Sequence, residues 1–525
     1  MADSRVNKLS IYLIKRHFLI GDVIKKKTQA YKKDIPNSGI LFITETKINP
    51  PSWIRSFFPD AEIDYEKMKI FNSYPGAVYL VRIDTEDGER IFAITFGAGW
   101  QMIDKDSIEE NFGFRTTLNL VSPKGIKSIN KKNIGLVQKS SRENIAKDGV
   151  FSDFGIDIDQ DLIQSLTGRA KDKNFGNMVF GRDSLHLSTD VNMNNVKDRL
   201  IDYYKAYKSE EYKNNFSWID KVKEINSKPL VLRLNEKMAA GIKNRETVEK
   251  IWLAIPETID WSDVAGFKFG NKKETVYPDL YLEDFEGVFA DENIDIDLLK
   301  RTNVYCVSTM GDKNLASWKL YKCIYAELED ENNKYILNGG KWYLVDKDFF
   351  DAVEDDYASF PVSSAELPEC PRGKNEMQYN EWVGETSGMT CMDTSHIIYD
   401  GHNSIEFCDV YSKSKKIFHI KRYGGTAVFN NLFSQGLISA RMFLSDKNFR
   451  RKVDAKFPNV LDTPADKKIN SGEYEIVFGI ISSSEKELVD IPFFSKMTLR
   501  SARKMIEAFG YNVAIKKILS QEKGI

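Results

Sequence analysis

Residues 404–422, SIEFCDVYSKSKKIFHIKR, decide the fold of the C-terminal part of the chain. Their β-branched and aromatic residues predict two strands, SIEFCDVYS and KIFHIKR, and the polar residues from Ser412 to Lys416 predict the turn between them. Side chains two residues apart on a strand point to the same face of a sheet, so we expect His419 and Lys421 to project together. Asp409 lies on the neighbouring strand, across the hairpin from them.

The elements on either side of this hairpin follow a definite order. Apolar residues at three- and four-residue spacing predict helices, and runs of β-branched residues predict strands. In chain order the prediction is a helix (NEMQYNEWVGE), a strand with a turn (TCMDTSHIIYD), the two hairpin strands, two helices (VFNNLFSQGLISARMFLS and NFRRKVDAKF), a strand (YEIVFGIIS) and a last helix (MTLRSARKMIEAFG). The core order is therefore helix, three strands, helix, strand.

This order, with an acid on the second strand and a lysine on the third, resembles the PD-(D/E)XK restriction-endonuclease-like nuclease fold over roughly residues 372–482. In that family, acids on these strands hold Mg²⁺ and the lysine supports the attacking water. Phosphodiester hydrolysis needs hard oxygen ligands for the metal and a cation that stabilises the developing charge. By position, the resemblance implies catalytic roles for Asp409, Lys421 and Glu376, and a substrate contact for Gln435.

One residue of the triplet departs from that family's pattern. His419 stands where the family has Glu, Asp or Gln, and a neutral imidazole suits Zn, Mn or Fe better than Mg. The resemblance still implies a divalent metal, Mg or Mn, held by Asp409, Glu406 and His419. His419 would act as a ligand or as a base. Glu406 would need a β-bulge to share the face of Asp409. The ordinary alternative is that Asp409 and Lys421 are strand ends, His419 a half-buried strand residue and Glu376 a surface helix residue.

The charge of the chain is unevenly distributed. The 525 residues carry a formal net charge of -2, which gives no global argument for a nucleic-acid partner. Residues 411–525, however, hold 21 Lys and Arg against 11 Asp and Glu. This surplus can neutralise phosphates, although solvated helix faces would also explain it. The side chains that we predict to contact DNA or RNA are Gln435, Arg422, Lys416, Arg441, Arg450 and Arg451.

The rest of the chain predicts an α+β multidomain protein. LSIYLIK, GILFITE, GAVYLVRID and ERIFAITFGAGW predict an antiparallel-sheet N-terminal domain, residues 1–145. A middle helical and β region, residues 146–360, contains predicted amphipathic helices at 157–168 and 194–225 and short strands from 277 to 345. The Pro-containing stretch 363–373 is the predicted linker to a C-terminal domain, residues 372–525, with the restriction-endonuclease-like α/β core.

Aromatic residues alternate with lysines in the second predicted helix of the middle region. Such a pattern can form a base-stacking surface. Most of these aromatics fall on the apolar face of the helix, so we predict core packing instead. They are Tyr203, Tyr204, Tyr207, Tyr212, Phe216 and Trp218.

Cysteine usage and hydropathy point to a cytoplasmic protein without a membrane segment. The five cysteines are odd in number and contain no C-x-x-C pair, so neither a disulfide framework nor a zinc ribbon fits. The five histidines are too dispersed for an evident metal cluster. The N-terminus lacks the apolar run of a signal peptide, and no apolar run approaches the roughly 20 residues that span a bilayer.

The whole chain is also similar to an uncharacterised, sporadically distributed bacterial family. The residues that carry this similarity include FAITFGAGW (92–100), NFGFRTTLN (111–119) and NLFSQGLISARMFLSD (431–446). Sporadic distribution is typical of anti-phage and restriction genes, so the resemblance implies a role in defence, with a partner protein in such a system.

These observations predict a metal-dependent nucleic-acid-binding protein and probable nuclease. One alternative is a catalytically inactive nuclease fold that serves as a sensor or scaffold for nucleic acid or a partner protein. A second alternative places the function in the N-terminal half, as an interaction or ligand-sensing platform. Several strands could also pair across a homo-oligomer, although nothing in the sequence specifies it.

Overall fold

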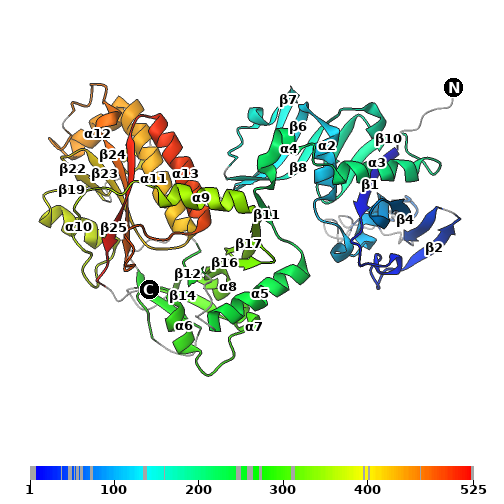
Figure 1. The fold of residues 1–525 in the computed structure, drawn as a ribbon, viewed down its shortest axis with the longest axis horizontal. Coiled ribbons are helices and arrows are strands. Elements are labelled where there is room, and N and C mark those ends of the chain that lie inside the picture. The colour runs from blue at the N-terminus through cyan, green and yellow to red at the C-terminus, as the bar shows by residue number, and fades with distance from the viewer. Residues whose placement is uncertain are drawn as a thin grey trace. The chain divides into compact units, whose positions relative to one another are not determined.

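The computed structural model describes residues 7–521, except 37, 45–49, 52–53, 55–57, 59–62, 65, 71–74, 134–138, 159, 244–249, 257–263, 271–274, 309–313, 394–396, 400–402 and 462. Contacts within the chain define two compact units (Figure 1). The first comprises Met1–Lys132, Ser140–Asp157 and Leu162–Ile219, and the second comprises Asn133–Lys139, Ile158–Asp161 and Asp220–Ile525. The predicted bounds of independently folding domains, 1–145, 146–360 and 372–525, remain a prediction.

The first unit is built on a ten-stranded sheet with the order β2-β3-β4-β5-β1-β10-β9-β8-β6-β7. Every pairing from β2 along this order to β8 is antiparallel, as the sequence predicts for the N-terminal region. Its strands are β1 (Asn7–Leu13), β2 (Ala30–Ile35), β3 (Gly39–Thr44), β4 (Gly76–Thr85), β5 (Gly88–Gly97), β6 (Val121–Asn133), β7 (Lys139–Gly149), β8 (Asp161–Ala170), β9 (Met178–Gly181) and β10 (Leu185–Thr189).

Helices cover the apolar side of this sheet. They are α2 (Phe112–Leu120), α3 (Val196–Lys208) and the short α4 (Lys213–Phe216). Tyr203, Tyr204, Tyr212 and Phe216 are buried in the same core as Phe92 of β5, which confirms the prediction of core packing for most of the aromatics in this region. The short 3-10 helices of the chain are η1 (Ile20–Asp22), η2 (Ala98–Met102), η3 (Lys105–Ser107), η4 (Phe151–Phe154), η5 (Lys173–Phe175), η6 (Ser217–Asp220) and η8 (Ser471–Glu473).

The prediction of a helix at residues 157–168 is wrong. The described part of this stretch belongs mainly to strand β8, which pairs with β9 from Leu166↔Gly181 to Arg169↔Met178. Its apolar residues at 162, 163 and 166 fit a helical spacing, but pairing with a distant strand satisfies the backbone and overrides that local pattern.

The second unit begins with two sheets. A five-stranded sheet has the order β11-β18-β17-β16-β12, and a three-stranded sheet has the order β13-β14-β15. β17 and β18 form a hairpin that turns at Gly339 and Gly340, both of which have positive φ. The elements are β11 (Val222–Glu224), α5 (Lys228–Lys243), β12 (Lys250–Leu253), β13 (Val264–Phe269), α6 (Leu282–Val288), α7 (Ile296–Arg301), β14 (Asn303–Ser308), β15 (Asn314–Lys319), α8 (Leu320–Cys323), β16 (Ile324–Asp330), β17 (Asn333–Asn338), β18 (Lys341–Val345) and α9 (Lys347–Ala358).

A mixed sheet with the order β19-β22-β23-β24-β25 organises the C-terminal part of the second unit. β19, β22 and β23 are antiparallel neighbours, whereas β23, β24 and β25 run parallel. The elements are α10 (Glu376–Thr386), β19 (Thr390–Cys391), β20 (Ile397–Tyr399), β21 (Asn403–Ile405), β22 (Val410–Ser412), β23 (Lys416–Arg422), α11 (Thr426–Ser445), α12 (Lys447–Lys456), β24 (Glu475–Ser482), α13 (Phe493–Ala508) and β25 (Asn512–Leu519).

Helices pack on both faces of this sheet, because the strands alternate their buried residues between two cores. Ile417 of β23 packs in one core with residues of α11 and α13, while Phe418 and Ile420 pack in the other with Tyr379 of α10. α11 and α13 lie side by side (Figure 1). The predicted elements follow the predicted order, but each of the first two predicted strands is divided. β19 and β22 join the mixed sheet, whereas β20 and β21 pair with each other in a separate two-stranded sheet.

The stretch predicted as a linker, residues 363–373, starts against the outer side of β25. Ser363 N donates to Ile515 O, and Cys370 N donates to Leu519 O. Ala365 and Cys370 are buried against the sheet. In the part of the chain that the structure describes, no helix is both long enough and apolar enough to cross a bilayer.

Candidate functional site

Asp409 is placed by the β22–β23 hairpin that the sequence predicts. Its backbone N–H donates to Phe418 O at 2.9 Å, which puts Asp409 opposite His419 at the start of β22. The side chain is 2% exposed, and its Oδ2 accepts a hydrogen bond from Ile420 N at 2.5 Å. A carboxylate that accepts a backbone N–H in this way has a fixed orientation, so Asp409 is held rigidly between two strands.

Glu376 and Lys421 form an ion pair beside Asp409. Glu376 is the first residue of α10, whose N-terminus is closed by a capping box from Asn375 to Gln378. The Lys421 ammonium donates to Glu376 Oε1, and Arg422 N donates to Glu376 Oε2 at 3.3 Å. Both side chains are mostly buried, so a helix start and a strand end are joined by one charge-assisted contact.

The electrostatics of this cluster are dominated by burial and by repulsion among carboxylates. Burial raises the pKa of Asp409 well above its usual value, Lys421 lowers it, and the neighbouring Glu376, Glu406 and Asp393 raise it further. Burial also raises the pKa of Glu376, against the opposing effect of Lys421. For Lys421 itself, burial lowers the pKa, but the Glu376 and Asp409 carboxylates outweigh burial and hold the pKa above its usual value. The cluster thus contains more carboxyl groups than its one lysine can neutralise.

Three carboxylates of this cluster lie close enough to hold one metal ion. Ligand oxygens of Asp393, Glu406 and Asp409 all lie within 4.8 Å of one another. Met392 N and Asp393 N both donate to Asp409 O, at 2.8 and 3.1 Å, which ties the end of β19 to the start of β22. Three such oxygens match the ligands that Mg²⁺ and Mn²⁺ prefer.

Asn380 supplies a further polar group at the same place. It lies one turn after Glu376 on α10, is fully buried, and donates from Nδ2 to Asp393 Oδ2 at 2.9 Å. Its Oδ1 is buried without a hydrogen-bond partner. Buried amide oxygens are nearly always satisfied, so the Asn380 oxygen beside these carboxylates is a further candidate ligand for a metal ion or acceptor for a water.

The sequence analysis did not identify Asp393 or Asn380. Asp393 directly follows β19, the strand that pairs with β22, so it lies at the same sheet edge as Asp409. The sequence feature that could have identified Asp393 is an acid directly after a strand that neighbours the strand of Asp409. For Asn380 the only such feature is its helical spacing, because a position one turn after Glu376 lies on the same face of α10.

His419 is buried and faces α11. Its Nε2 lies 2.8 Å from Ser439 Oγ, and only 2% of the residue is exposed. Burial lowers the pKa of His419 to about 3, and Lys421 lowers it further, so the ring is neutral. Among the described residues, the carboxylate group that could hold a metal does not include His419. Its role as a ligand stays a prediction; His396 and His402 lie outside the described residues.

Three of the residues predicted to contact nucleic acid lie near this cluster or on the strand that carries it. Arg422 Nη2 donates to Lys374 O, and Lys416 donates to Glu475 and to Ser363 Oγ. Gln435 is half-buried on α11, and its Oε1 has no hydrogen-bond partner. Two of these residues are therefore held by protein partners, while the Gln435 amide retains an open acceptor.

The other three lie on or near α12. Arg441 is exposed at the end of α11, and Arg451 pairs with Asp466 at 2.7 Å on the surface. Arg450 is 5% exposed and donates to the carbonyl oxygens of Phe443, Leu444, Ala465 and Lys467. A phosphate contact through Arg450 would require these bonds to break. Arg451 would have to exchange its surface pair with Asp466, whereas Arg441 is exposed.

The fold and site describe a mixed α+β protein with a buried carboxylate–lysine cluster at the end of a strand hairpin. The chain belongs to the family of unknown function DUF6119, whose model matches residues 9–519. No curated protein and no solved structure matches the chain.

Proposed function

We propose that the C-terminal part of the chain, residues 372–525, is a divalent-metal-dependent phosphodiesterase that acts on DNA or RNA. The observation that carries this proposal is the convergence of Glu376, Asp409 and Lys421 with Asp393 and Glu406 in one cluster. Acids that can hold a metal, together with a lysine at the same site, are the groups that metal-assisted hydrolysis of a phosphate ester uses.

In this proposal Asp393, Glu406 and Asp409 hold the metal. When bound, Mg²⁺ or Mn²⁺ would neutralise the surplus of carboxylates and polarise a phosphate oxygen. Lys421 orients the attacking water and stabilises negative charge on the phosphate. Glu376 holds the lysine ammonium in place and is a second acceptor beside the water. His419, neutral and bonded to Ser439, packs behind Lys421.

Basic residues on and around α12 would position the nucleic-acid backbone. Arg441 is exposed enough to contact a phosphate, and Arg451 can exchange its surface pair with Asp466 for one. Gln435, whose Oε1 is buried without a partner, would have to turn outward to contact a sugar hydroxyl or a base. Lys416 and Arg422 contribute to the positive field of residues 411–525. Backbone contacts of this kind set affinity and register and carry no sequence preference.

Loss of cleavage in charge-neutral variants tests the proposal. We expect Asp409→Asn and Lys421→Met to reduce cleavage of DNA or RNA at least about 100-fold with Mg²⁺ or Mn²⁺, since both change groups needed at the reacting phosphate. Asp409→Asn is nearly isosteric and keeps an acceptor for Ile420 N. Lys347→Met, which removes an exposed lysine of α9 outside residues 372–525, is the matched control and should cleave like the wild type.

The assay uses the full chain with single- and double-stranded DNA and RNA, and separates products by gel electrophoresis. Equal cleavage by wild type, Asp409→Asn and Lys421→Met would show that the activity lies elsewhere and would end the proposal.

A catalytically inactive sensor or scaffold is the second candidate. It is favoured by the Glu376–Lys421 ion pair, which occupies the lysine, and by the nearly complete burial of Asp409. Calorimetric titration with Mn²⁺ separates the two functions. Heat released on Mn²⁺ binding by the wild type but not by Asp409→Asn supports the metal site. If Mn²⁺ binding produces no heat but the protein retards a DNA probe in a gel, the scaffold function is supported.

We extend this proposal to a cytoplasmic role in bacterial defence, with a partner protein or a second copy of the chain. Its support is the sequence resemblance, and the expected result is that Asp409→Asn abolishes protection of cells against phage. Protection that survives deletion of residues 372–525 would instead place the function in the N-terminal half.

A further inference from the structure

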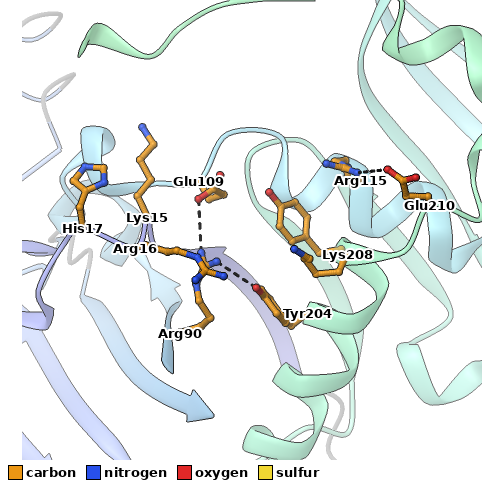
Figure 2. A pocket seen from close by; sticks show the side chains of 10 residues that line it. Lys15, Arg16, His17, Arg90, Glu109, Arg115, Tyr204, Lys208 and Glu210 are labelled. Atoms are coloured by element: carbon orange, nitrogen blue, oxygen red, sulfur yellow. Dashed lines mark hydrogen bonds and ion pairs between the residues drawn. The ribbon is translucent and has the colours of Figure 1, made fainter. Parts of the chain in front are cut away.

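A pocket of ≈ 630 Å³ opens in the first compact unit (Figure 2). None of the residues that line it belongs to the segments that form the carboxylate cluster. Its wall is formed by residues 15–17 after β1, by Arg90 of β5, by Arg115 of α2, and by the end of α3 with Tyr204, Tyr207 and Lys208. Ligand pockets for small molecules typically measure about 300–1,000 Å³. The pocket therefore has the size of a small-molecule site.

The lining of this pocket is strongly basic. It contains five Lys or Arg side chains, with His17, against two carboxylates, Glu109 and Glu210. Arg16 and Lys208 share one further carboxylate, that of Asp87, at 3.5 and 3.0 Å. Several cations that converge on a concave surface raise the local concentration of anions.

Arg90 is the most deeply placed of these cations. It is 5% exposed, its Nη2 donates to Ile14 O at 3.0 Å, and its Nη1 lies 3.4 Å from Tyr204 Oη. Glu109 Oε2 lies 3.7 Å from Nη2, and Figure 2 shows the guanidinium between Glu109 and Tyr204. Nε is buried without a hydrogen-bond partner. A guanidinium with an unused donor and one long carboxylate contact retains capacity for a second anion.

Arg115 repeats this pattern on the other side of the pocket. Its guanidinium lies over the rings of Tyr207 and Tyr212, at 5.6 and 5.8 Å from their centroids, and 4.0 Å from Glu210 Oε1. Its Nε is also buried without a hydrogen-bond partner. Two stacked tyrosines hold this guanidinium plane in place, which is the arrangement that suits recognition of phosphate oxygens by arginine.

We propose that this pocket binds a small phosphate ester or polyphosphate that carries at least two negative charges. Arg90 and Arg115 contact its phosphate oxygens, while Lys15, Arg16 and Lys208 supply long-range attraction. Nucleotides and free pyrophosphate share this chemistry. The site lies in the first unit and is independent of the proposed nuclease function.

Calorimetric titration of the full chain with ADP, pyrophosphate and adenosine tests the site. We expect saturable binding of ADP or pyrophosphate and none of adenosine, because adenosine lacks the phosphates. Pyrophosphate alone would identify a phosphate site, and tighter binding of ADP would identify a nucleotide site. Arg115→Gln should weaken binding about tenfold, because it removes a charge-assisted contact. Lys208→Gln should weaken binding less, about threefold, because it removes only long-range attraction.

Lys197→Gln is the matched control, because it removes an exposed lysine of α3 outside the pocket and should bind like the wild type. Circular dichroism verifies that each variant is folded. The proposal is overturned if neither phosphate compound binds at 10 mM (roughly the upper limit for a weak site), if adenosine binds as tightly as ADP, or if folded Arg115→Gln and Lys208→Gln both bind like the wild type.

Discussion

At the scale of the residue, the candidate site consists of charged groups held in the interior at a cost in stability. The pKa of Asp409 is raised by burial, so the folded state binds a proton more tightly than the unfolded chain does, and stability falls as pH rises through the folded pKa. Polar groups that destabilise their own fold are expected where function requires them. Asp409→Asn should therefore stabilise the protein at neutral pH while it abolishes metal binding.

His419 provides a pH-dependent prediction of opposite sign. Its pKa is about 3 when folded, against 6.5 for an ordinary histidine, so below pH 6.5 only the unfolded chain takes up the proton. The free energy of unfolding should fall as pH is lowered through this range, by about 2 kcal/mol at pH 4.5 from this residue alone. His419→Gln should remove that part of the pH dependence, as measured by urea unfolding at pH 7 and pH 4.5.

His17→Gln, which removes an exposed histidine, is the control and should leave the pH dependence of unfolding as in the wild type. An identical loss of stability in wild type and His419→Gln at low pH would show that the buried histidine does not remain neutral in the folded state.

At the scale of the element, the sequence predicts the hairpin that carries the site. It predicts the neighbouring elements only in part. Alternating apolar residues identified β22 and β23, and the turn between them, because that signal is local. β8 was misread as a helix, since its pairing partner lies distant in sequence. Asp393 and Asn380 join the site only because β19 pairs with β22 and α10 packs on the sheet, which are contacts that no local pattern encodes.

The packing of α11 on β24 yields a second prediction. A Cβ added at Gly436 would lie 2.5 Å from Phe478 Cε1 and 3.3 Å from Ile476 Cγ2, so the helix and strand would have to separate. Gly436→Ala should therefore destabilise the protein by about 1–3 kcal/mol, although alanine favours helices. Thermal unfolding monitored by circular dichroism measures this change.

Gly287→Ala in α6 is the matched control, because an added Cβ there meets nothing within 4 Å. It should be neutral or stabilise the chain by up to about 1 kcal/mol. Equal unfolding temperatures for the wild type and Gly436→Ala would mean that α11 does not pack as closely on β24 as described.

At the scale of the whole molecule, the near-zero net charge conceals a basic C-terminal part and an acidic remainder. This distribution can be read from the amino-acid sequence, because counting charges requires no knowledge of the fold. It could not tell which cations are free for a ligand. Arg450, counted among the predicted contacts, is instead bonded to four carbonyl oxygens, whereas Arg441 on the preceding helix is exposed.

These two arginines should differ in the salt dependence of nucleic-acid binding. We expect the affinity to fall linearly with the logarithm of salt concentration, and Arg441→Gln to reduce the slope by about 1 through loss of one phosphate contact. Arg450→Gln should leave the slope unchanged but lower the free energy of unfolding, by roughly 1.5–3 kcal/mol. Fluorescence anisotropy of a labelled oligonucleotide between 50 and 300 mM NaCl (about threefold below and twofold above 0.15 M) measures the slopes. A larger loss of slope for Arg450→Gln would reverse the assignment.

The proline-containing segment beside β25 affects how copies of this protein can associate. Exposed strand edges are templates on which a second chain can add a strand. Backbone bonds from Ser363 and Cys370 occupy positions in the middle and at the C-terminal end of β25, and prolines 361, 368 and 371 offer no N–H to an incoming strand. The proline-containing segment therefore covers this edge and prevents fibril-like growth from it. A dimer formed by continuing the sheet would first have to displace this segment from β25.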